Sequence, residues 1–225
     1  MRMSTAIESA IEPLLHSPCL REIVEALQNR VREESALRHA FYEDLRDDQK
    51  AEFIDGQVIL NSPARNKHLI VRQHLEKLLH TYVGVHGLGE VRGEKCLCVF
   101  PRNDYEPDVV FFGPQRAAGL TGETMKFPIP DFAAEVLSES TAARDRGVKF
   151  EDYEAHGVTE YWILDPDAEV IEQYIRRGDR FCLALKSGSG EIASTTVVGF
   201  RIPIRALFDP AENLAALRQL IAPEG

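Results

Sequence analysis

Two carboxylates stand in stretches of the sequence that are otherwise apolar. Asp108 directly precedes the run VVFF at 109–112, and Glu135 lies inside FAAEVLS between apolar neighbours. A carboxylate in a buried strand is costly unless it is paired, hydrogen-bonded or bound to a metal. If the two strands are neighbours in one sheet, the carboxylates converge, and a shared proton or a hard cation is the usual way to relieve their repulsion. The pattern therefore predicts a buried acidic site, although Asp108 could instead cap a backbone group where a strand begins.

Four further residues could complete such a site. Lys149 lies one turn before Tyr153 on a predicted helix, so the two share a face. A lysine beside two carboxylates and a metal can stabilise or deprotonate a water nucleophile. Glu52 could supply a third carboxylate, and His68 could face the site from the start of a helix. Each has an ordinary alternative: a solvated lysine, a packed tyrosine, an exposed glutamate and a helix-capping histidine.

The periodicity of the chain predicts the elements that position these residues. Helical spacing covers 5–45, which includes the start of a polar segment at 29–48. Helical spacing returns at 66–83, 142–156 and 210–221. The strand-like runs are FIDGQVIL, KCLCVF, DVVFFG, FAAEVLS, EYWILDP, EVIEQYIRRG and RFCLALK. Asp55-Gly56 predicts a hairpin turn, and Gly157 a helix end. This mixed order favours an α/β fold around a mixed sheet over a doubly wound parallel fold.

Composition limits the class of protein. The chain has 225 residues, 44% of them hydrophobic, and a formal net charge of −10. Such a negative charge argues against a protein that coats nucleic acid through bulk electrostatics. It does not exclude an enzyme that acts on nucleic acid, because acidic metal ligands add negative charge that a bound metal reverses locally. No apolar run approaches the roughly 20 residues that span a membrane. We expect no secretory signal and a cytoplasmic location.

The cysteines predict no metal site. Cys96 and Cys98 form a C-x-C pair in a predicted strand, and Cys19 and Cys182 stand far from them in the sequence. A zinc site would need two further ligands at suitable spacing, and the sequence offers no second Cys or His pair. We expect Cys96 and Cys98 to be small core residues in a reducing compartment.

The ordered set of motifs resembles a known family. Pro107-Asp108, then Glu135 27 residues after the aspartate, then a downstream lysine resemble the PD-(D/E)xK nuclease superfamily. At closer range, the chain looks like the bacterial Uma-type endonuclease family, formerly a domain of unknown function. The matching segments are EFIDGQVIL with His68 downstream, YEPDVVF, PDFAAEVLSEST and DRGVKFEDYEAHGVTEYWILDP. The resemblance covers approximately residues 45–210, and the block 130–166 is its most specific part.

The resemblance implies a restriction-endonuclease-like core in residues 46–225, with a mixed central sheet flanked by helices, after an N-terminal helical extension in 1–45. It implies Mg²⁺ or Mn²⁺ bound by Asp108 and Glu135, with Glu52 and Lys149 as further catalytic residues. The superfamily pattern E-x-K would place a lysine two residues after Glu135, where this chain has Leu137. In this family the lysine is expected on the following helix, as Lys149.

The function implied is metal-dependent hydrolysis of phosphodiester bonds in nucleic acid, with DNA as the expected substrate. His68 and Tyr153 would lie beside the metal ligands. Because one such site cuts one strand at a time, double-strand cleavage would call for a homodimer. No membrane partner is expected.

Two other functions fit parts of the sequence. The first is an inactive nuclease fold that serves binding or assembly, which the acidic balance and the lack of a basic DNA-binding segment favour. The second is a hydrolase whose paired carboxylates act as acid and base, as in glycosidases. The single tryptophan offers little surface for stacking on sugar rings.

Overall fold

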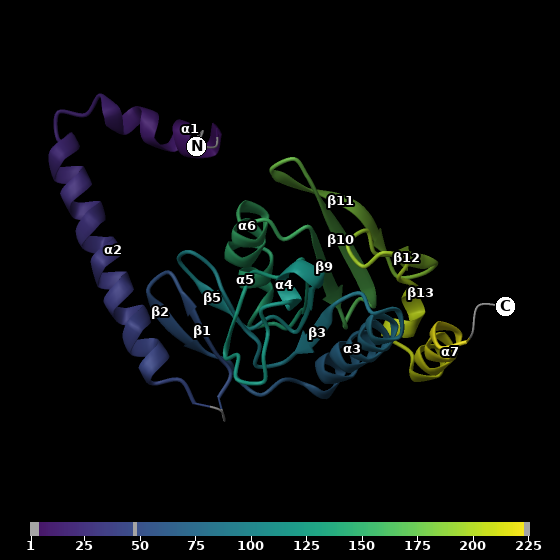
Figure 1. Cartoon of the computed structure of the whole chain (residues 1–225). Helices are drawn as coiled ribbons and strands as arrows, with labels where there is room; N and C mark the ends of the chain where they lie inside the picture. Colours follow the sequence, from purple (N-terminus) through teal and green to yellow (C-terminus); the bar gives the residue numbers. More distant parts are fainter. Residues whose placement is uncertain (1–4, 47–48, 223–225) are drawn as a thin grey trace.

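The computed structural model describes residues 5–46 and 49–222, and a six-stranded mixed sheet forms the centre of this part of the chain (Figure 1). Its strands, in spatial order, are β11 (Arg180–Ser187), β10 (Val170–Arg177), β9 (Glu160–Asp165), β8 (Phe132–Val136), β6 (Val109–Phe112) and β3 (Glu90–Gly93). Strands β8 and β9 run parallel, whereas β6 runs antiparallel to β8. The predicted mixed α/β architecture is confirmed.

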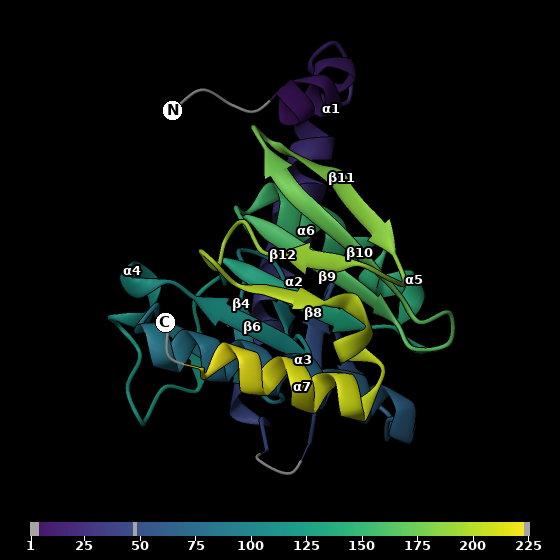
Figure 2. The same ribbon diagram turned by 90° about the vertical axis from the view of Figure 1, so that its right-hand side faces the viewer.

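The central strands are buried on both faces, which explains why their sequences are apolar runs without alternation. Val109 and Phe111 of β6 pack toward helices α3 (Asn66–His86) and α7 (Pro210–Leu220). Figure 2 shows these two helices side by side along that face. Val110 and Phe112 point to the opposite face and pack with Tyr153 of helix α6 (Val148–Ala155). Tyr153, which the sequence analysis groups with Lys149, therefore lies on this second face.

A smaller five-stranded sheet lies beside the second face. It consists of β2 (Gln57–Leu60), β1 (Ala51–Ile54), β5 (Asp104–Tyr105), β4 (Leu97–Val99) and β7 (Lys126–Phe127) in that order. Strands β1 and β2 form the predicted hairpin, and the positive φ angles of Asp55 and Gly56, 51° and 82°, are those of a primed turn. Cys96 and Cys98 are buried free thiols in the core between the sheets, as predicted.

The remaining elements are short. They are α4 (Pro114–Ala117), α5 (Ala142–Asp145), β12 (Glu191–Ala193), β13 (Arg201–Pro203) and a 3₁₀ helix (Ile204–Leu207). Among the described residues, no helix is long and apolar enough to cross a membrane.

The prediction of one continuous helix over 142–156 is wrong, because two short helices, α5 and α6, occupy this range. Gly147 separates α5 from α6 with φ −111° and ψ −107°, outside the helical region. A Cβ on Gly147 would lie 2.8 Å from the carbonyl oxygen of Ala143, so this tight passage requires glycine. The break lets Asp145 and Lys149 approach the site from two short helices. Gly157, with φ 86°, ends α6 as expected.

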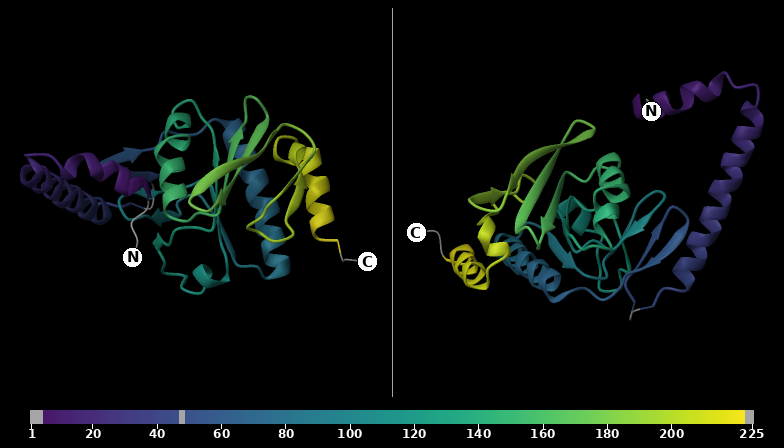
Figure 3. Two further views of the ribbon diagram at one scale, coloured as in Figure 1. Left: turned by 90° about the horizontal axis from the view of Figure 1, so that it is seen from above. Right: turned by 180° about the vertical axis from the view of Figure 1, so that it is seen from behind.

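The N-terminal residues form an arm that projects from one side of the molecule, opposite α7 (Figure 3). Helix α1 (Thr5–Leu15) precedes the long helix α2 (Leu20–Glu43). Most of the segment predicted as polar is helical, because α2 continues to Glu43. The last turns of α2 pack on the domain, where the ring of Phe41 stacks on that of Phe53 in β1 with 5.7 Å between centroids. The proposed boundary between an extension at 1–45 and a nuclease domain at 46–225 stays a prediction.

Ion pairs with buried carboxylates connect α2 to the domain. Arg102 donates to both carboxylate oxygens of Glu34, at 2.8 and 2.9 Å, and Arg30 Nε lies 2.8 Å from Glu34 Oε1. Arg38 Nε donates to Asp104 Oδ2 at 2.8 Å. The hydrogen bonds from Arg102 and Arg30 outweigh burial and lower the pKa of Glu34 to about 2.

We expect Glu34→Gln to weaken this attachment by about 1.5–3 kcal/mol at pH 7, the range for hydrogen bonds to charged groups. A carboxyl whose pKa is lowered on folding stabilises the fold above its unfolded pKa of 4.5, and this contribution is lost as the pH falls toward 2. Denaturant unfolding of both proteins should therefore show a constant difference above about pH 5.5 and a shrinking one below about pH 4.5. Glu33→Gln, at an exposed position on the same helix, is the control; an equal loss there would contradict this assignment.

Candidate active site

The candidate site lies where the chain passes from the five-stranded to the six-stranded sheet. Residues 106–108 make this crossing between β5 and β6. Val109 of β6 pairs with Ala134 of β8 in antiparallel register, so the preceding Asp108 stands opposite Glu135. Residues opposite each other share a face of the sheet. The predicted convergence of the two carboxylates is therefore what the strand register produces.

Asp108 is held by three donors. The backbone N–H of Val136 donates to Oδ2 at 2.8 Å, and His68 Nε2, from the first turn of α3, lies 3.1 Å from the same oxygen. Lys50 Nζ donates to Oδ1 at 3.2 Å. Burial by itself would raise the pKa of Asp108, but the Lys50 ammonium and the His68 contact outweigh it and hold this pKa well below its usual range. Asp108 is thus an anion at neutral pH.

Glu135 is held by the helix that follows its strand. Lys149 Nζ and Tyr153 Oη donate to Glu135 Oε1 at 2.9 and 3.0 Å. Both side chains are fully buried and lie one turn apart on α6, as the sequence predicts. Burial raises the pKa of Glu135 to about 8. The Lys149 ammonium opposes this rise, whereas Asp145 and other nearby acids add to it. A cation bound at this position would oppose that shift, because it favours the ionised carboxylate.

Glu52 joins the same cluster from the other sheet. Lys149 Nζ lies 2.9 Å from Glu52 Oε1, the same distance as from Glu135, so one ammonium bridges carboxylates from β1 and β8. Glu52 Oε1 also accepts the backbone N–H of Glu106 at 3.0 Å. The structure thus brings together all six residues that the sequence singles out: Glu52, His68, Asp108, Glu135, Lys149 and Tyr153.

Three residues of the site were missed by sequence reasoning. Lys50 precedes Glu52 by two residues, and Asp145 precedes Lys149 by four, with its Oδ1 3.4 Å from Lys149 Nζ. Glu106 is buried beside Glu52, and burial raises its pKa to about 7. The spacings i, i+2 on a strand and i, i+4 on a helix place residues on one face, so they could have revealed Lys50 and Asp145.

The donor set suits a hard divalent cation. Five buried carboxyl groups, from Glu52, Glu106, Asp108, Glu135 and Asp145, face the two ammonium groups of Lys50 and Lys149. Neither carboxylate oxygen of Asp145 has a hydrogen-bond partner within the described chain. Yet the described residues contain no group of three acids or other ligands already arranged to hold a metal. Such a site fits Mg²⁺, which often takes one or two carboxylates and completes its shell with water and substrate phosphates.

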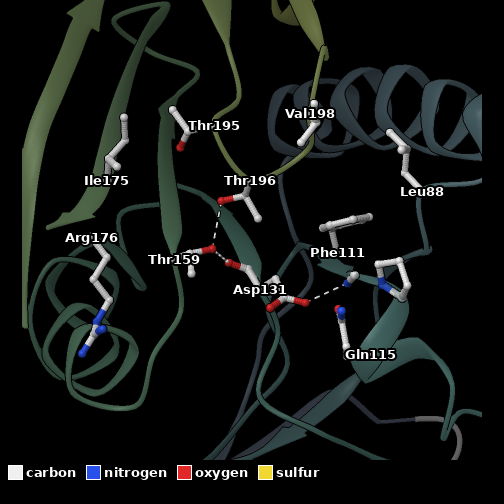
Figure 4. Close-up of a pocket in the computed structure, with 12 residues that line it drawn as sticks. Leu88, Phe111, Gln115, Asp131, Thr159, Ile175, Arg176, Thr195, Thr196 and Val198 are labelled. Carbon is white, nitrogen blue, oxygen red and sulfur yellow. Dashed lines mark hydrogen bonds between the residues drawn. The ribbon is translucent and has the colours of Figure 1, made fainter. Parts of the chain in front are cut away.

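A separate cavity of about 540 Å³ lies at the opposite ends of the same strands (Figure 4). Several of its polar groups are already engaged: Asp131 accepts the N–H of Gly113 at 2.7 Å and pairs with Arg116, and the hydroxyls of Thr159 and Thr196 bond each other at 2.9 Å. None of the six predicted residues lines it. We therefore place the chemistry at the acidic cluster.

The architecture is shared with a protein of known structure. It matches the crystal structure of a protein from Anabaena variabilis, described as "a putative nuclease belonging to DUF820", with a TM-score of 0.65 over 79% of this chain and 96% of that chain. The two sequences are 18% identical, so this likeness concerns the fold.

The family follows from the sequence match. Residues 37–205 match Uma2, described as "Putative restriction endonuclease", and the chain belongs to this family. An uncharacterized protein of Synechocystis sp. is 28% identical over 134 residues, which cover 59% of this chain and 75% of that protein. The resemblance and the fold expected from the sequence are both confirmed.

Proposed function

We propose that this protein is a metal-dependent endonuclease that hydrolyses phosphodiester bonds in nucleic acid, with DNA as its substrate. One observation carries the proposal: Asp108 and Glu135 stand opposite each other on adjacent buried strands, and Lys149 joins Glu135 to Glu52. A buried acidic cluster with its own lysine, in a chain of the Uma2 family, supports hydrolytic chemistry on a phosphate ester.

In this proposal, Asp108 and Glu135 bind Mg²⁺ or Mn²⁺, and substrate oxygens complete the shell. When bound, such an ion polarises a phosphoryl oxygen and lowers the pKa of a coordinated water. His68 and the Val136 N–H orient Asp108, since both contact Oδ2 and leave Oδ1 toward Lys50. Tyr153 orients Glu135 through its 3.0 Å hydrogen bond.

Lys149 acts on the carboxylates. Its ammonium lies within 2.9 Å of Glu52 and Glu135, and it keeps these acids close together despite their charge. Its three acidic partners occupy the ammonium, so Lys149 orients the carboxylates. The contact of Lys149 with the attacking water that its residue type suggests is not tested by this geometry.

Nucleic acid is the proposed partner, a homodimer the proposed assembly for double-strand cleavage, and the cytoplasm the proposed location. The chain's formal net charge of −10 means that its overall field repels DNA. Binding must then depend on metal and on local contacts, so the apparent affinity should rise with Mg²⁺ concentration.

The direct test is cleavage of supercoiled plasmid, linear duplex, single-stranded DNA and RNA with Mg²⁺, Mn²⁺ or excess chelator. The proposal expects cleavage of a DNA substrate with metal and none with chelator. Binding of DNA without cleavage under any metal would instead support the inactive binding module. Asp108 would then be a structural residue whose carboxylate is compensated by its contacts with Lys50 and His68. Cleavage that continues in chelator would contradict the metal-dependent mechanism.

A further inference from the structure

The two lysines of the acidic cluster differ in their surroundings. Lys149 is enclosed: its side chain is 4% exposed and lies near carboxylates of Glu52, Glu135 and Asp145. Lys50 is the more open, with 23% of its side chain exposed, and Asp108 is its ion-pair partner within the described chain. An enclosed ammonium that three acids surround is poorly placed to meet a substrate anion. An ammonium with one acidic partner on a partly exposed side chain is better placed to do so.

The backbone at Lys50 is fixed although its side chain is partly open. The carbonyl oxygen of Lys50 accepts the N–H of Asn61 at 3.0 Å, which extends the β1–β2 ladder by one pair. The next residues anchor the strand, since Ala51 and Phe53 are buried against Phe41 of α2. Lys50 and Glu52 therefore point to the same side of a rigid strand, toward the acidic cluster.

Lys50 faces an acid of the cluster. Its Nζ lies 3.2 Å from Asp108 Oδ1, and a lysine side chain ordinarily carries a positive charge at neutral pH. Because this ammonium lies so close to the proposed metal ligand Asp108 and its side chain is 23% exposed, a phosphate oxygen bound to the same metal would be within its reach.

We propose that Lys50 is a catalytic residue that contacts the scissile phosphate, whereas Lys149 is a positioning residue. This inference rests on the proposed nuclease function. In the reaction, a water oxygen bonds to phosphorus, one bridging P–O bond breaks, and the water loses a proton to solvent while the leaving oxygen gains one. Lys50 stays protonated throughout and donates a hydrogen bond to a non-bridging oxygen, which gains negative charge in the transition state.

Lysine footprinting tests this contact without relying on turnover. The protein is reductively methylated in Ca²⁺, with and without a bound 20-base-pair DNA duplex, and each lysine is followed by mass spectrometry. We expect DNA to slow modification of Lys50 at least tenfold, with Lys149 unmodified in both states. Lys186, 60% exposed and paired with Glu172, should react at one rate throughout. An unchanged Lys50 rate while gel shift shows DNA bound would overturn the inference and leave the proposed function standing.

A variant pair completes the test. Lys50→Gln should lower kcat by roughly 10²–10³-fold, the usual loss of a donor to a developing oxyanion, while KM changes little. Its Tm should also fall, because the buried Asp108 loses its ion-pair partner, so assays are run well below the Tm of the variant. Lys186→Gln is the matched control and should retain kcat. Lys50→Arg, which keeps the charge, should recover part of the activity. A Lys50→Gln protein with the parent's kcat would refute the inference, whereas a parent that binds DNA, protects Lys50 and never cleaves would refute the proposed function and leave Lys50 as a phosphate contact.

Discussion

Replacing Asp108 with asparagine is expected to reduce metal-dependent cleavage by more than about 100-fold. Outer-shell partners of a metal commonly contribute about 10–100-fold, and a ligand should contribute more. Asparagine keeps the shape of the side chain but removes the charge that Lys50 and His68 now face at 3.2 and 3.1 Å. The loss should appear in kcat at saturating DNA, measured as plasmid nicking in Mg²⁺ and in Mn²⁺.

The design needs a control for folding, because Asp108 is also an ion-pair partner. A carboxyl with a lowered pKa stabilises the fold above its unfolded pKa of 3.8, so Asp108→Asn should unfold more easily than the parent at pH 7. Assays are therefore run well below the Tm of the variant. Asp167→Asn, which removes the exposed partner of Lys67, should retain activity. Undiminished cleavage by a folded Asp108→Asn protein would rule out Asp108 as a ligand.

Replacing Lys149 with methionine is expected to cause a large loss of stability. Methionine fills similar volume, but Glu52, Glu135 and Asp145 would lose the one ammonium that all three share. Removing one partner of a buried ion pair typically costs 3–5 kcal/mol, because an uncompensated charge stays behind. In a domain of 150–250 residues, this corresponds to a Tm about 6–20 °C lower.

The loss should depend on pH with a definite sign. Glu135 and Asp145 already have raised pKa values, and removal of Lys149 would raise them further. The variant should therefore recover stability as the pH falls and these carboxyls take up protons. Thermal unfolding at about pH 5.5 and pH 8.5 measures this, with Lys77→Met on the exposed face of α3 as the control. Equal destabilisation at both pH values would contradict a charge-based role for Lys149.

The sequence predicted which charged side chains come together where one strong rule applied. Acids inside apolar strands must be compensated, so Asp108 and Glu135 stood out, and the helical spacing of Lys149 and Tyr153 placed both on one face. The hairpin at Asp55-Gly56 and the helix end at Gly157 followed from backbone preferences that few other residues share.

Other features depend on tertiary contacts that no local pattern encodes. The division into two sheets follows from the crossing at 106–108, whose turn between β5 and β6 has no strong sequence signal. At the helix break, a Cβ on Gly147 would lie 2.8 Å from the carbonyl oxygen of Ala143, a contact that only the folded chain reveals. Lys50 resembles any polar residue before a hairpin until Asp108 is found 3.2 Å away.

The measurement that tests the central claim most directly is calorimetric titration of Mn²⁺ into the metal-free protein, alone and with a duplex that carries a non-hydrolysable linkage. Glu135→Ala is titrated beside the parent. We predict one Mn²⁺ per active site in the parent, tighter with DNA because phosphate oxygens complete the shell, and proton release as Glu135 ionises. The variant should not bind. Absence of binding in the parent even with DNA, or equal binding by Glu135→Ala, would contradict the assignment of Asp108 and Glu135 as the metal site.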